Sequence, residues 1–169
     1  METKLQKVSQ ETTVRKNSST PSPSALEAHL GFWLRFVSNH VSARFQQQLE
    51  AQGVSVAEWV ALRTLWEGEA SSHAQLIDAL GMTKGAVSKV VSRLEEKGLA
   101  ERQLADGNAR DQQLVLTAAG RKLLPQLAAL ADANDAHFFG HLDAAERRAL
   151  LKAMQALVRH HQLKSLPAA

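Results

Sequence analysis

The sequence predicts a mainly α-helical protein, with a winged helix-turn-helix core that has a short β-hairpin wing and is flanked by long N- and C-terminal dimerisation helices. Two observations predict this architecture. Capping-box signatures recur along the chain, each followed by apolar residues at helical spacing. A stretch near the middle, residues 99–117, instead has the pattern of strand, turn and strand. At 169 residues the chain has the length of one ordinary domain.

The composition excludes several classes of protein. The chain has no cysteine, so disulfides, thiolate metal sites, cysteine nucleophiles and thiol-based redox sensing are excluded. A net charge of +3 and a pI of 9.4 suit a polyanionic partner and equally suit an ordinary soluble protein. No apolar run approaches the roughly 20 residues of a membrane span, and the N-terminus lacks a secretory apolar segment. We therefore expect a cytoplasmic protein.

Both ends of the chain are expected to lie outside a single domain of residues 25–163. Residues 1–24 are rich in Ser, Thr, Lys and Gln and end in a Pro-containing stretch, which indicates a disordered N-terminal arm. Its basic residues could contact DNA phosphates, but such segments are more commonly solubilising tails, so we assign the arm no function. Residues 164–169 are expected to form a flexible tail.

The first helix is expected to begin at Ser24, where Glu27 three residues later completes a capping box. Apolar residues then recur at helical spacing up to Gly53, which ends the helix. A second capping box, formed by Ser55 and Glu58, starts the second helix.

Two short helices joined by a tight turn come next. Ser72 and Gln75 form a third capping box, and Gly81 ends that helix. Thr83 then caps a fourth helix with one apolar face. Its other faces carry the polar and basic side chains Lys84, Ser88, Lys89, Ser92 and Arg93. This arrangement indicates a helix-turn-helix.

A hairpin wing follows the helix-turn-helix. Gly98 closes the fourth helix, and the turn Asp106-Gly107-Asn108 lies between two strand-like segments. The winged helix-turn-helix DNA-binding core is therefore expected to cover residues 55–117.

Two long helices are expected after the wing. Thr117 caps the first, and Asp143 with Glu146 starts the second. Pro125 lies inside the first of these helices, where we expect a kink rather than a break. The apolar stripes of these helices and of the first helix are too long for the small core to cover. Residues 25–53 and 118–163 are therefore expected to form a dimer interface.

The fourth helix is a candidate DNA-reading element. A helix fits the major groove, and short polar or basic side chains near its N-terminus can reach bases and phosphates, while a hairpin tip can enter the minor groove. The candidate DNA-binding residues are Ser72, Thr83, Lys84, Gly85, Ala86, Ser88, Lys89, Ser92, Arg93, Asn108 and Arg110. The alternatives are a solvated face for the basic helical residues, and for Arg110 an ion pair with Asp106 or Asp111 that stiffens the loop.

Residues 72–120 resemble the DNA-binding core of MarR-type regulators, and their sequence is SHAQLIDALGMTKGAVSKVVSRLEEKGLAERQLADGNARDQQLVLTAAG. The resemblance rests on the helix end VSRLEEKGL, on the arginine in the wing, and on the pair Leu116-Thr117 followed by Gly120. It extends over about residues 25–163. It implies a triangular homodimer in which the first and last two helices interlock. The wing arginine corresponds to Arg110. Asn108 stands where the family usually has an aspartate, so a neutral hydrogen bond replaces an orienting ion pair.

The resemblance implies a sequence-specific regulator of transcription that binds double-stranded DNA, with repression as the family's common mode. A dimer would place two reading helices on successive major grooves, so the expected operator is an inverted repeat with half-sites about one helical turn apart. The implied effector is a small, often aromatic or anionic molecule bound between the dimerisation helices and the core. The candidate pocket residues are Trp33, His40, Trp59, Arg63 and Trp66, for which plain core packing is the alternative.

Three other functions have weaker support in the sequence. A metal-responsive regulator would use His137, His141, His160 and His161, but a third ligand at a suitable distance is missing, so we expect no metal and no cofactor. An enzyme is not expected, because the sequence has no phosphate loop, Gly-x-Ser-x-Gly elbow or His-Glu-x-x-His motif. A protein-protein interaction module would pack the fourth helix on a partner, which its polar, basic face disfavours.

Overall fold

The computed structural model describes residues 23–68, 70–104 and 112–163. Most of the expected arm, the expected tail, and the wing residues Asn108 and Arg110 lie outside the described residues. Helices make up most of the described chain, and a small sheet accompanies them, which confirms the predicted fold class.

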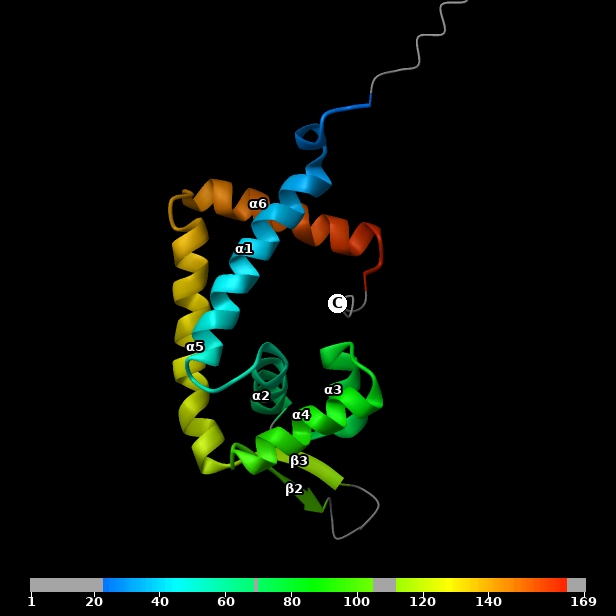
Figure 1. Ribbon diagram of the computed structural model, residues 1–169, viewed down its shortest axis with the longest axis vertical. Helices are drawn as coiled ribbons and strands as arrows, with labels where there is room; N and C mark the ends of the chain where they lie inside the picture. Colours follow the sequence, from blue (N-terminus) through cyan, green and yellow to red (C-terminus); the bar gives the residue numbers. More distant parts are fainter. Residues whose placement is uncertain (1–22, 69, 105–111, 164–169) are drawn as a thin grey trace, which may run out of the picture.

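The described chain has an upper helical part and a lower lobe (Figure 1). In chain order its elements are η1 (Leu26–Ala28), α1 (Leu30–Glu50), α2 (Val56–Gly68), β1 (Ala70–Ser72), α3 (His73–Leu80), α4 (Lys84–Glu96), β2 (Ala100–Leu104), β3 (Gln112–Leu116), α5 (Ala118–Phe139) and α6 (Ala144–His160). The helices α1 and α5 lie side by side, and α6 crosses the N-terminal part of α1, while α2, α3, α4 and the sheet form the lower lobe. The long helix α5 reaches both parts and runs through Pro125 without a break.

Capping boxes start three of the helices, as predicted. At α2 the Ser55 backbone N–H donates to Glu58 Oε2 at 2.7 Å, and the Glu58 N–H donates to Ser55 Oγ at 3.2 Å. Equivalent reciprocal pairs are present at the starts of α3 and α6. Thr83 and Thr117 each accept one backbone hydrogen bond at the starts of α4 and α5. These helices therefore begin where a side chain satisfies N–H groups that have no partner within the helix.

The predicted start of the first helix is wrong. Only the short 3₁₀ helix η1 forms there, and His29 is extended before α1 begins at Leu30. Ser24 caps no helix: Ala25 and His29 precede η1 and α1 and make no side-chain cap bond, while Ser24 Oγ lies 3.0 Å from Nε2 of the His29 ring. The backbone is extended at His29, so the helical path that begins at Leu26 does not continue into α1 and the capping pattern at Ser24 and Glu27 is not used.

The wing belongs to a three-stranded antiparallel sheet with the strand order β1-β3-β2. Strands β2 and β3 form the predicted hairpin, in which Ala100 lies opposite Leu116. Strand β1 pairs Ser72 with Gln113 and was not predicted. Three residues are too few to show the alternation of a strand, and the partner strand lies far along the chain.

The core lies between α2, α4 and the lower half of α5. Its fully buried apolar side chains include Leu49, Leu62, Leu65, Leu76, Val87, Leu94, Leu124 and Leu127. Full burial of one such side chain contributes about 1.5–3 kcal/mol. The lobe that carries the helix-turn-helix is thus stabilised by apolar packing that includes Leu49 at the end of α1 and Leu124 and Leu127 of α5.

The N-terminal half of α1 and the whole of α6 keep apolar side chains at the surface. The exposed ones include Leu30, Trp33, Leu34, Phe36 and Val37 on α1 and Leu150, Leu151, Met154, Leu157 and Val158 on α6. Within the described chain α6 has no buried residue at all, so its apolar stripe is uncovered. None of the helices in the described ranges is long and apolar enough to cross a membrane.

A buried asparagine joins α1 to α5. Asn134, which is 5 % exposed, donates from Nδ2 to the Val41 carbonyl oxygen at 3.2 Å and accepts from the Arg44 guanidinium at 3.1 Å. A buried amide is costly unless its polar atoms are paired. These bonds therefore hold α5 in one register against α1.

Candidate nucleic-acid interface

The reading helix α4 has one apolar face and one polar face, because its apolar residues recur at helical spacing. Its buried residues are Val87, Val90, Val91 and Leu94. Thr83 Oγ1 accepts a hydrogen bond from the Ala86 N–H at 3.3 Å and fixes the start of the helix. The polar face therefore points to solvent.

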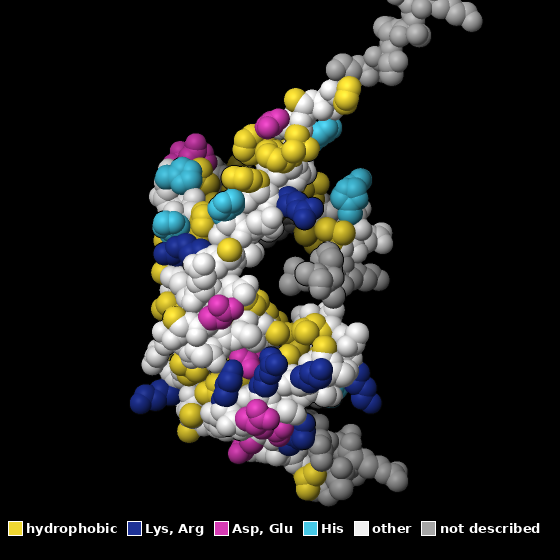
Figure 2. Space-filling view, viewed as in Figure 1, with side chains coloured by type: hydrophobic (Ala, Val, Ile, Leu, Met, Phe, Trp, Pro, Cys, Tyr) yellow, Lys and Arg dark blue, Asp and Glu magenta, His cyan; other side chains and the backbone are white. Residues whose placement is uncertain are grey.

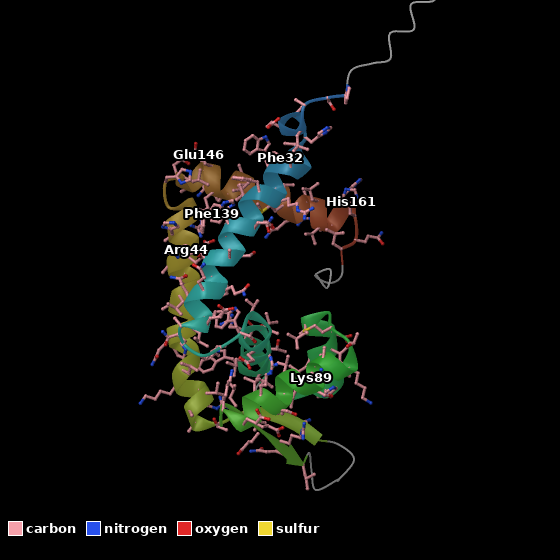
Figure 3. All side chains as sticks on the ribbon, viewed as in Figure 1. Phe32, Arg44, Lys89, Phe139, Glu146 and His161 are labelled. Carbon is pink, nitrogen blue, oxygen red and sulfur yellow. The ribbon has the colours of Figure 1, made fainter. Side chains whose placement is uncertain are left out.

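Three basic side chains of this polar face are exposed. Lys84, Lys89 and Arg93 have no carboxylate oxygen within 4.0 Å among the described residues. Lys and Arg side chains gather in a row over α4 (Figure 2), and Lys89 lies on that helix, far from Phe32 and His161 at the other end of the molecule (Figure 3). Cations without a protein counter-ion can neutralise phosphates and release condensed counterions, so this face suits DNA.

The surface between these basic residues is hollowed. A shallow groove is lined by Ser88, Lys89, Ser92, Arg93 and Glu96. The two serine hydroxyls can donate or accept hydrogen bonds at base edges. Four of the predicted DNA-binding residues of α4 are thus brought together on one side of the helix.

The first turn of α4 carries little side-chain bulk. A Cβ added at Gly85 would meet no atom within 4 Å, so the packing of the protein itself does not require glycine there. The next residue, Ala86, is also small and half-buried. Backbone N–H groups at a helix N-terminus bind phosphate when the approach is open. The start of α4 is therefore accessible to a DNA backbone.

Two further predicted DNA-binding residues, Ser72 and Thr83, serve as helix caps. Ser72 Oγ accepts a hydrogen bond from the Gln75 N–H at 3.3 Å, as Thr83 does at α4. Each hydroxyl still has a hydrogen to donate. The capping role is therefore compatible with a phosphate contact.

Two residues that contact α4 were not predicted from the sequence. His73 Nε2 lies 3.4 Å from both the Lys84 carbonyl oxygen and Ser88 Oγ, and so links α3 to α4. Arg102 on β2 pairs with Glu95 at 3.3 Å and links the wing to α4. Both contacts join different elements of the fold, so no local pattern in the sequence indicates them.

The C-terminal end of α4 is held by a buried ion pair between Lys97 and Glu58, whose atoms lie 2.7 Å apart. Burial acts to raise the pKa of Glu58, but hydrogen bonds from Lys97 and from the Ser55 N–H, with the charge of Lys97, outweigh it and lower the pKa below its ordinary value. Glu58 is therefore ionised at neutral pH.

Two of the candidate pocket residues lie together on α2. Trp59 packs edge-on against Phe45 with ring centroids 5.9 Å apart, and the Arg63 guanidinium lies 5.8 Å from the centroid of the Trp59 ring. Arg63 also pairs with Glu67 at 2.7 Å. An arginine over an indole is a cation–π arrangement that leaves part of the guanidinium available to another anion.

The other three candidate pocket residues lie elsewhere in the single chain. Trp33 donates from Nε1 to the Glu27 carbonyl oxygen at 2.9 Å, near the start of α1. His40 Nδ1 lies 2.7 Å from the Phe36 carbonyl oxygen. Trp66 is 43 % exposed near the end of α2. The structure therefore brings Trp59 and Arg63 together and separates them from Trp33.

The histidines do not gather into a metal-binding cluster within the described ranges. No group of three or more His, Asp or Glu residues there could hold a metal ion. The rings of His160 and His161 are 4.7 Å apart, and the His137 ring packs against Phe138.

A family model and several relatives match the chain. The model of the MarR family matches residues 52–111, which run from the end of α1 into the wing. The HTH-type transcriptional repressor Rv2887 of Mycobacterium tuberculosis is 28 % identical over 131 residues, which cover 78 % of this chain and 94 % of the relative. The HTH-type transcriptional repressor NicR of Pseudomonas putida is 26 % identical over 151 residues, which cover 89 % and 96 %.

Solved structures share the fold. BpsR of Bordetella bronchiseptica, whose DNA binding is regulated by 6-hydroxynicotinic acid, superposes with a TM-score of 0.70 at 26 % identity, over 81 % of this chain and 99 % of that one. A variant of Escherichia coli MarR in complex with operator DNA superposes with a TM-score of 0.67 at 20 % identity, over 76 % and 93 %.

The geometry of α4 and the comparisons lead to the same conclusion. The relatives are named as transcriptional repressors and regulators, which confirms the expectation of a regulator rather than an enzyme. The polar, basic face of α4 belongs to the segment that the family model covers. The segment that carries α4 therefore matches the MarR family, and two relatives that match over more than three quarters of this chain are transcriptional repressors.

Proposed function

We propose that this protein represses transcription by binding an inverted-repeat operator as a homodimer, and that a small molecule releases it from DNA. The observation that carries the proposal is the face of α4, where Lys84, Lys89 and Arg93 are exposed opposite a fully packed apolar face. A helix of this kind reads the major groove while its basic residues contact phosphates.

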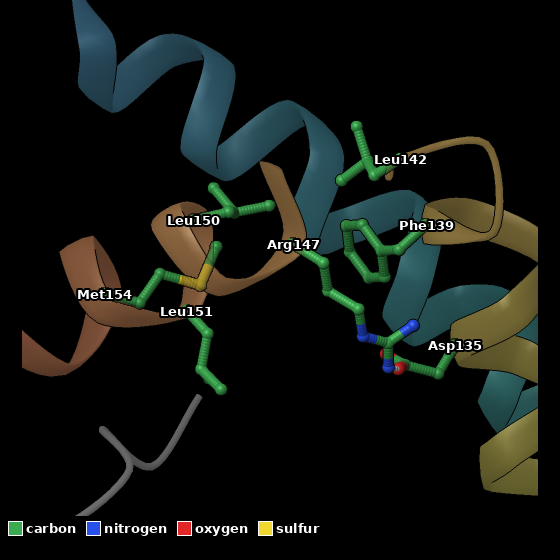
Figure 4. Close-up of a pocket in the computed structure, with 7 residues that line it drawn as sticks. All are labelled: Asp135, Phe139, Leu142, Arg147, Leu150, Leu151 and Met154. Carbon is green, nitrogen blue, oxygen red and sulfur yellow. Dashed lines mark hydrogen bonds and ion pairs between the residues drawn. The ribbon is translucent and has the colours of Figure 1, made fainter. Parts of the chain in front are cut away.

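The homodimer is supported by the uncovered apolar side chains of α1 and α6. The hollow between the end of α5 and α6 is lined mainly by apolar residues, among them Phe139, Leu142, Leu150 and Met154 (Figure 4). The ion pair of Arg147 with Asp135 is its polar boundary. An apolar stripe along a whole helix is unfavourable in water, and a second copy related by a two-fold axis is the commonest way to cover it.

The inverted repeat follows from the two-fold axis. Two copies of α4 would enter successive major grooves, so the half-sites should be about 34–36 Å apart from centre to centre. Ser88 and Ser92 would supply hydrogen bonds to base edges, while Lys89 and Arg93 would contact phosphates. Further phosphates would lie near Ser72, Thr83 and the first turn of α4. Asn108 and Arg110 are proposed for the minor groove on the basis of the family resemblance.

The proposed effector is an aromatic or anionic small molecule. Trp59 and Arg63 provide an aromatic surface beside a guanidinium, a pair that suits an aromatic carboxylate. The relative BpsR responds to 6-hydroxynicotinic acid, which has this chemistry. We infer that Trp33, His40 and Trp66 complete the site in the dimer, and 6-hydroxynicotinic acid is the first compound to test.

The test is a fluorescence-anisotropy titration of the purified protein with DNA from upstream of its own gene and with a scrambled duplex of equal length, at physiological salt. We expect tight, selective binding with a stoichiometry of two chains per duplex, and weaker binding when an effector is added. Equal binding to both duplexes, followed by failure of a random-sequence selection, would contradict the proposal and favour a protein-protein interaction module.

A further inference from the structure

The C-terminal end of α4 is tied to the segment between α1 and α2 through one lysine. Lys97 Nζ donates to Glu58 Oε1 at 2.8 Å, to Glu58 Oε2 at 2.7 Å and to the Gly53 carbonyl oxygen at 2.7 Å. Gly53 lies in the turn after α1, and Glu58 lies in the first turn of α2. An ammonium group has three N–H donors, so Lys97 has enough donors to engage all three acceptors of this one segment.

The carboxylate of Glu58, which pairs with Lys97, is held in a single position. Glu58 is 1 % exposed and also accepts from the Ser55 N–H at 2.7 Å, whereas the Lys97 side chain is 37 % exposed. If Lys97 moved away, a buried charge would lose its counter-ion, which is strongly unfavourable. The end of α4 is therefore fixed relative to the α1–α2 turn.

The ion pair of Lys97 with Glu58 lies one helical turn from Arg93, a proposed DNA-binding residue. Arg93 on α4 and Lys97, the residue that caps its C-terminal end, are four residues apart and line the same surface hollow as Gly53 and Glu58. The helix α1, which ends just before Gly53, carries part of the apolar surface assigned above to the dimer interface. One cation thus connects the end of the reading helix to the turn that directly follows α1, the helix assigned to the interface of the proposed dimer.

We propose that Lys97 is a positioning residue that sets the angle of α4 relative to α1 and thereby selects the half-site spacing that the dimer accepts. This rests on the proposed function, since it requires a dimer on an inverted repeat. Each added base pair moves a half-site by about 3.4 Å along the DNA and about 34° around it. If α4 is held at a fixed angle to α1, the dimer binds weakly to an operator whose half-sites have the wrong spacing. If α4 can change its angle, the dimer binds such an operator almost as well as the correct one.

The experiment compares inverted repeats that differ only in the number of central base pairs. Fluorescence anisotropy gives the dissociation constants of full-length wild type and of Lys97→Met for the best spacing and for spacers one base pair shorter and longer. We expect the wild type to lose about tenfold or more in affinity at a wrong spacing, and the variant to lose less than about threefold.

Two further variants separate positioning from folding and from charge. Glu58→Gln/Lys97→Met removes both charges, so it leaves no buried ion without a partner, and circular dichroism and light scattering verify that it is a folded dimer. Lys122→Met removes an equivalent exposed charge from α5, and we expect it to keep the wild-type dependence on spacing.

The outcomes are distinct. A weakened dependence on spacing in the folded double variant, together with an unchanged dependence in Lys122→Met, supports the role of Lys97. A folded, dimeric double variant with the wild-type dependence overturns this inference and leaves the proposed function standing. A wild-type protein that prefers no inverted repeat over scrambled DNA overturns both.

Discussion

Gly120, in the first turn of α5, lies directly against the carbonyl oxygen of Leu99. A Cβ at position 120 would stand 2.0 Å from that oxygen and 3.0 Å from the Leu99 carbonyl carbon. Thr117 holds the same junction, since its hydroxyl donates to the Gly98 carbonyl oxygen at 2.6 Å. The start of α5 is thus fixed against the base of the wing, and only glycine fits there.

Gly120→Ala is therefore expected to destabilise the protein by about 1–3 kcal/mol or more, because the backbone has to move to admit the methyl group. Urea unfolding measures the change. Gly85→Ala is the matched control, since it has open space and should be neutral or stabilising by up to about 1 kcal/mol. Unchanged stability of Gly120→Ala would show that the junction relaxes freely.

Lys89→Ala and Arg93→Ala are expected to weaken operator binding while leaving the dimer intact. For each lost phosphate contact, the slope of log affinity against log salt should fall by about 0.9. Lys122→Ala, on α5, controls for the loss of net charge. Affinity and salt slope equal to the wild type would remove these residues from the reading surface.

Met154→Glu is expected to give a folded monomer that no longer binds the operator. Met154 is 39 % exposed in the single chain and lines two apolar hollows on α6, so a carboxylate is tolerated in the monomer and disfavoured under a second copy. Light scattering gives the mass. Lys152→Glu, on the opposite side of α6, should remain dimeric, and a dimeric Met154→Glu would place the interface elsewhere.

The Glu58–Lys97 pair predicts a defined dependence of stability on pH. The folded-state pKa of Glu58 lies below the ordinary value of 4.5, so the ionised carboxylate stabilises the fold above that pH. The contribution is lost as the pH falls through the folded-state pKa. Glu58→Gln should cost about 1–3 kcal/mol at neutral pH, and the difference from wild type should shrink in acid. A difference that does not vary with pH would contradict the assignment.

Arg63→Gln is expected to keep operator binding and to lose the response to an aromatic carboxylate. The guanidinium of Arg63 lies against Trp59 on α2, and Arg63 is not among the proposed DNA-binding residues, so the substitution removes a proposed effector contact only. Anisotropy titrations with and without 6-hydroxynicotinic acid measure both properties. Release of the variant from DNA at the wild-type effector concentration would exclude Arg63 from the site.

Features that depend on a few neighbouring residues could be predicted from the sequence. The capping pairs at Ser55 and Ser72 are examples, because each helix start is decided by two side chains three residues apart. The apolar face of α4 and the hairpin also follow from local periods in the sequence. The pair Ser24 and Glu27 has the same pattern but makes no cap, since the helix there ends after one turn and the backbone is extended at His29.

Features that join distant parts of the chain could not be predicted. Lys97 meets Glu58 across 39 residues, and Asn134 meets Val41 across 93. Nothing near Lys97 in the sequence distinguishes it from an ordinary surface lysine at the end of a helix. Only the packing of α4 against α2 places its ammonium group on a buried carboxylate.

The length of α5 has a mechanical consequence. The helix has 22 residues, which at about 1.5 Å per residue make a rod about 33 Å long. Since one end is fixed to the wing and the other leads into α6, it can act as a lever. A tilt of about 5° at one end displaces the other by about 3 Å, nearly the rise of about 3.4 Å per base pair. In the proposed regulator, an effector would need to tilt this rod by only that amount to shift a DNA-binding lobe by about one base-pair step, without unfolding any element.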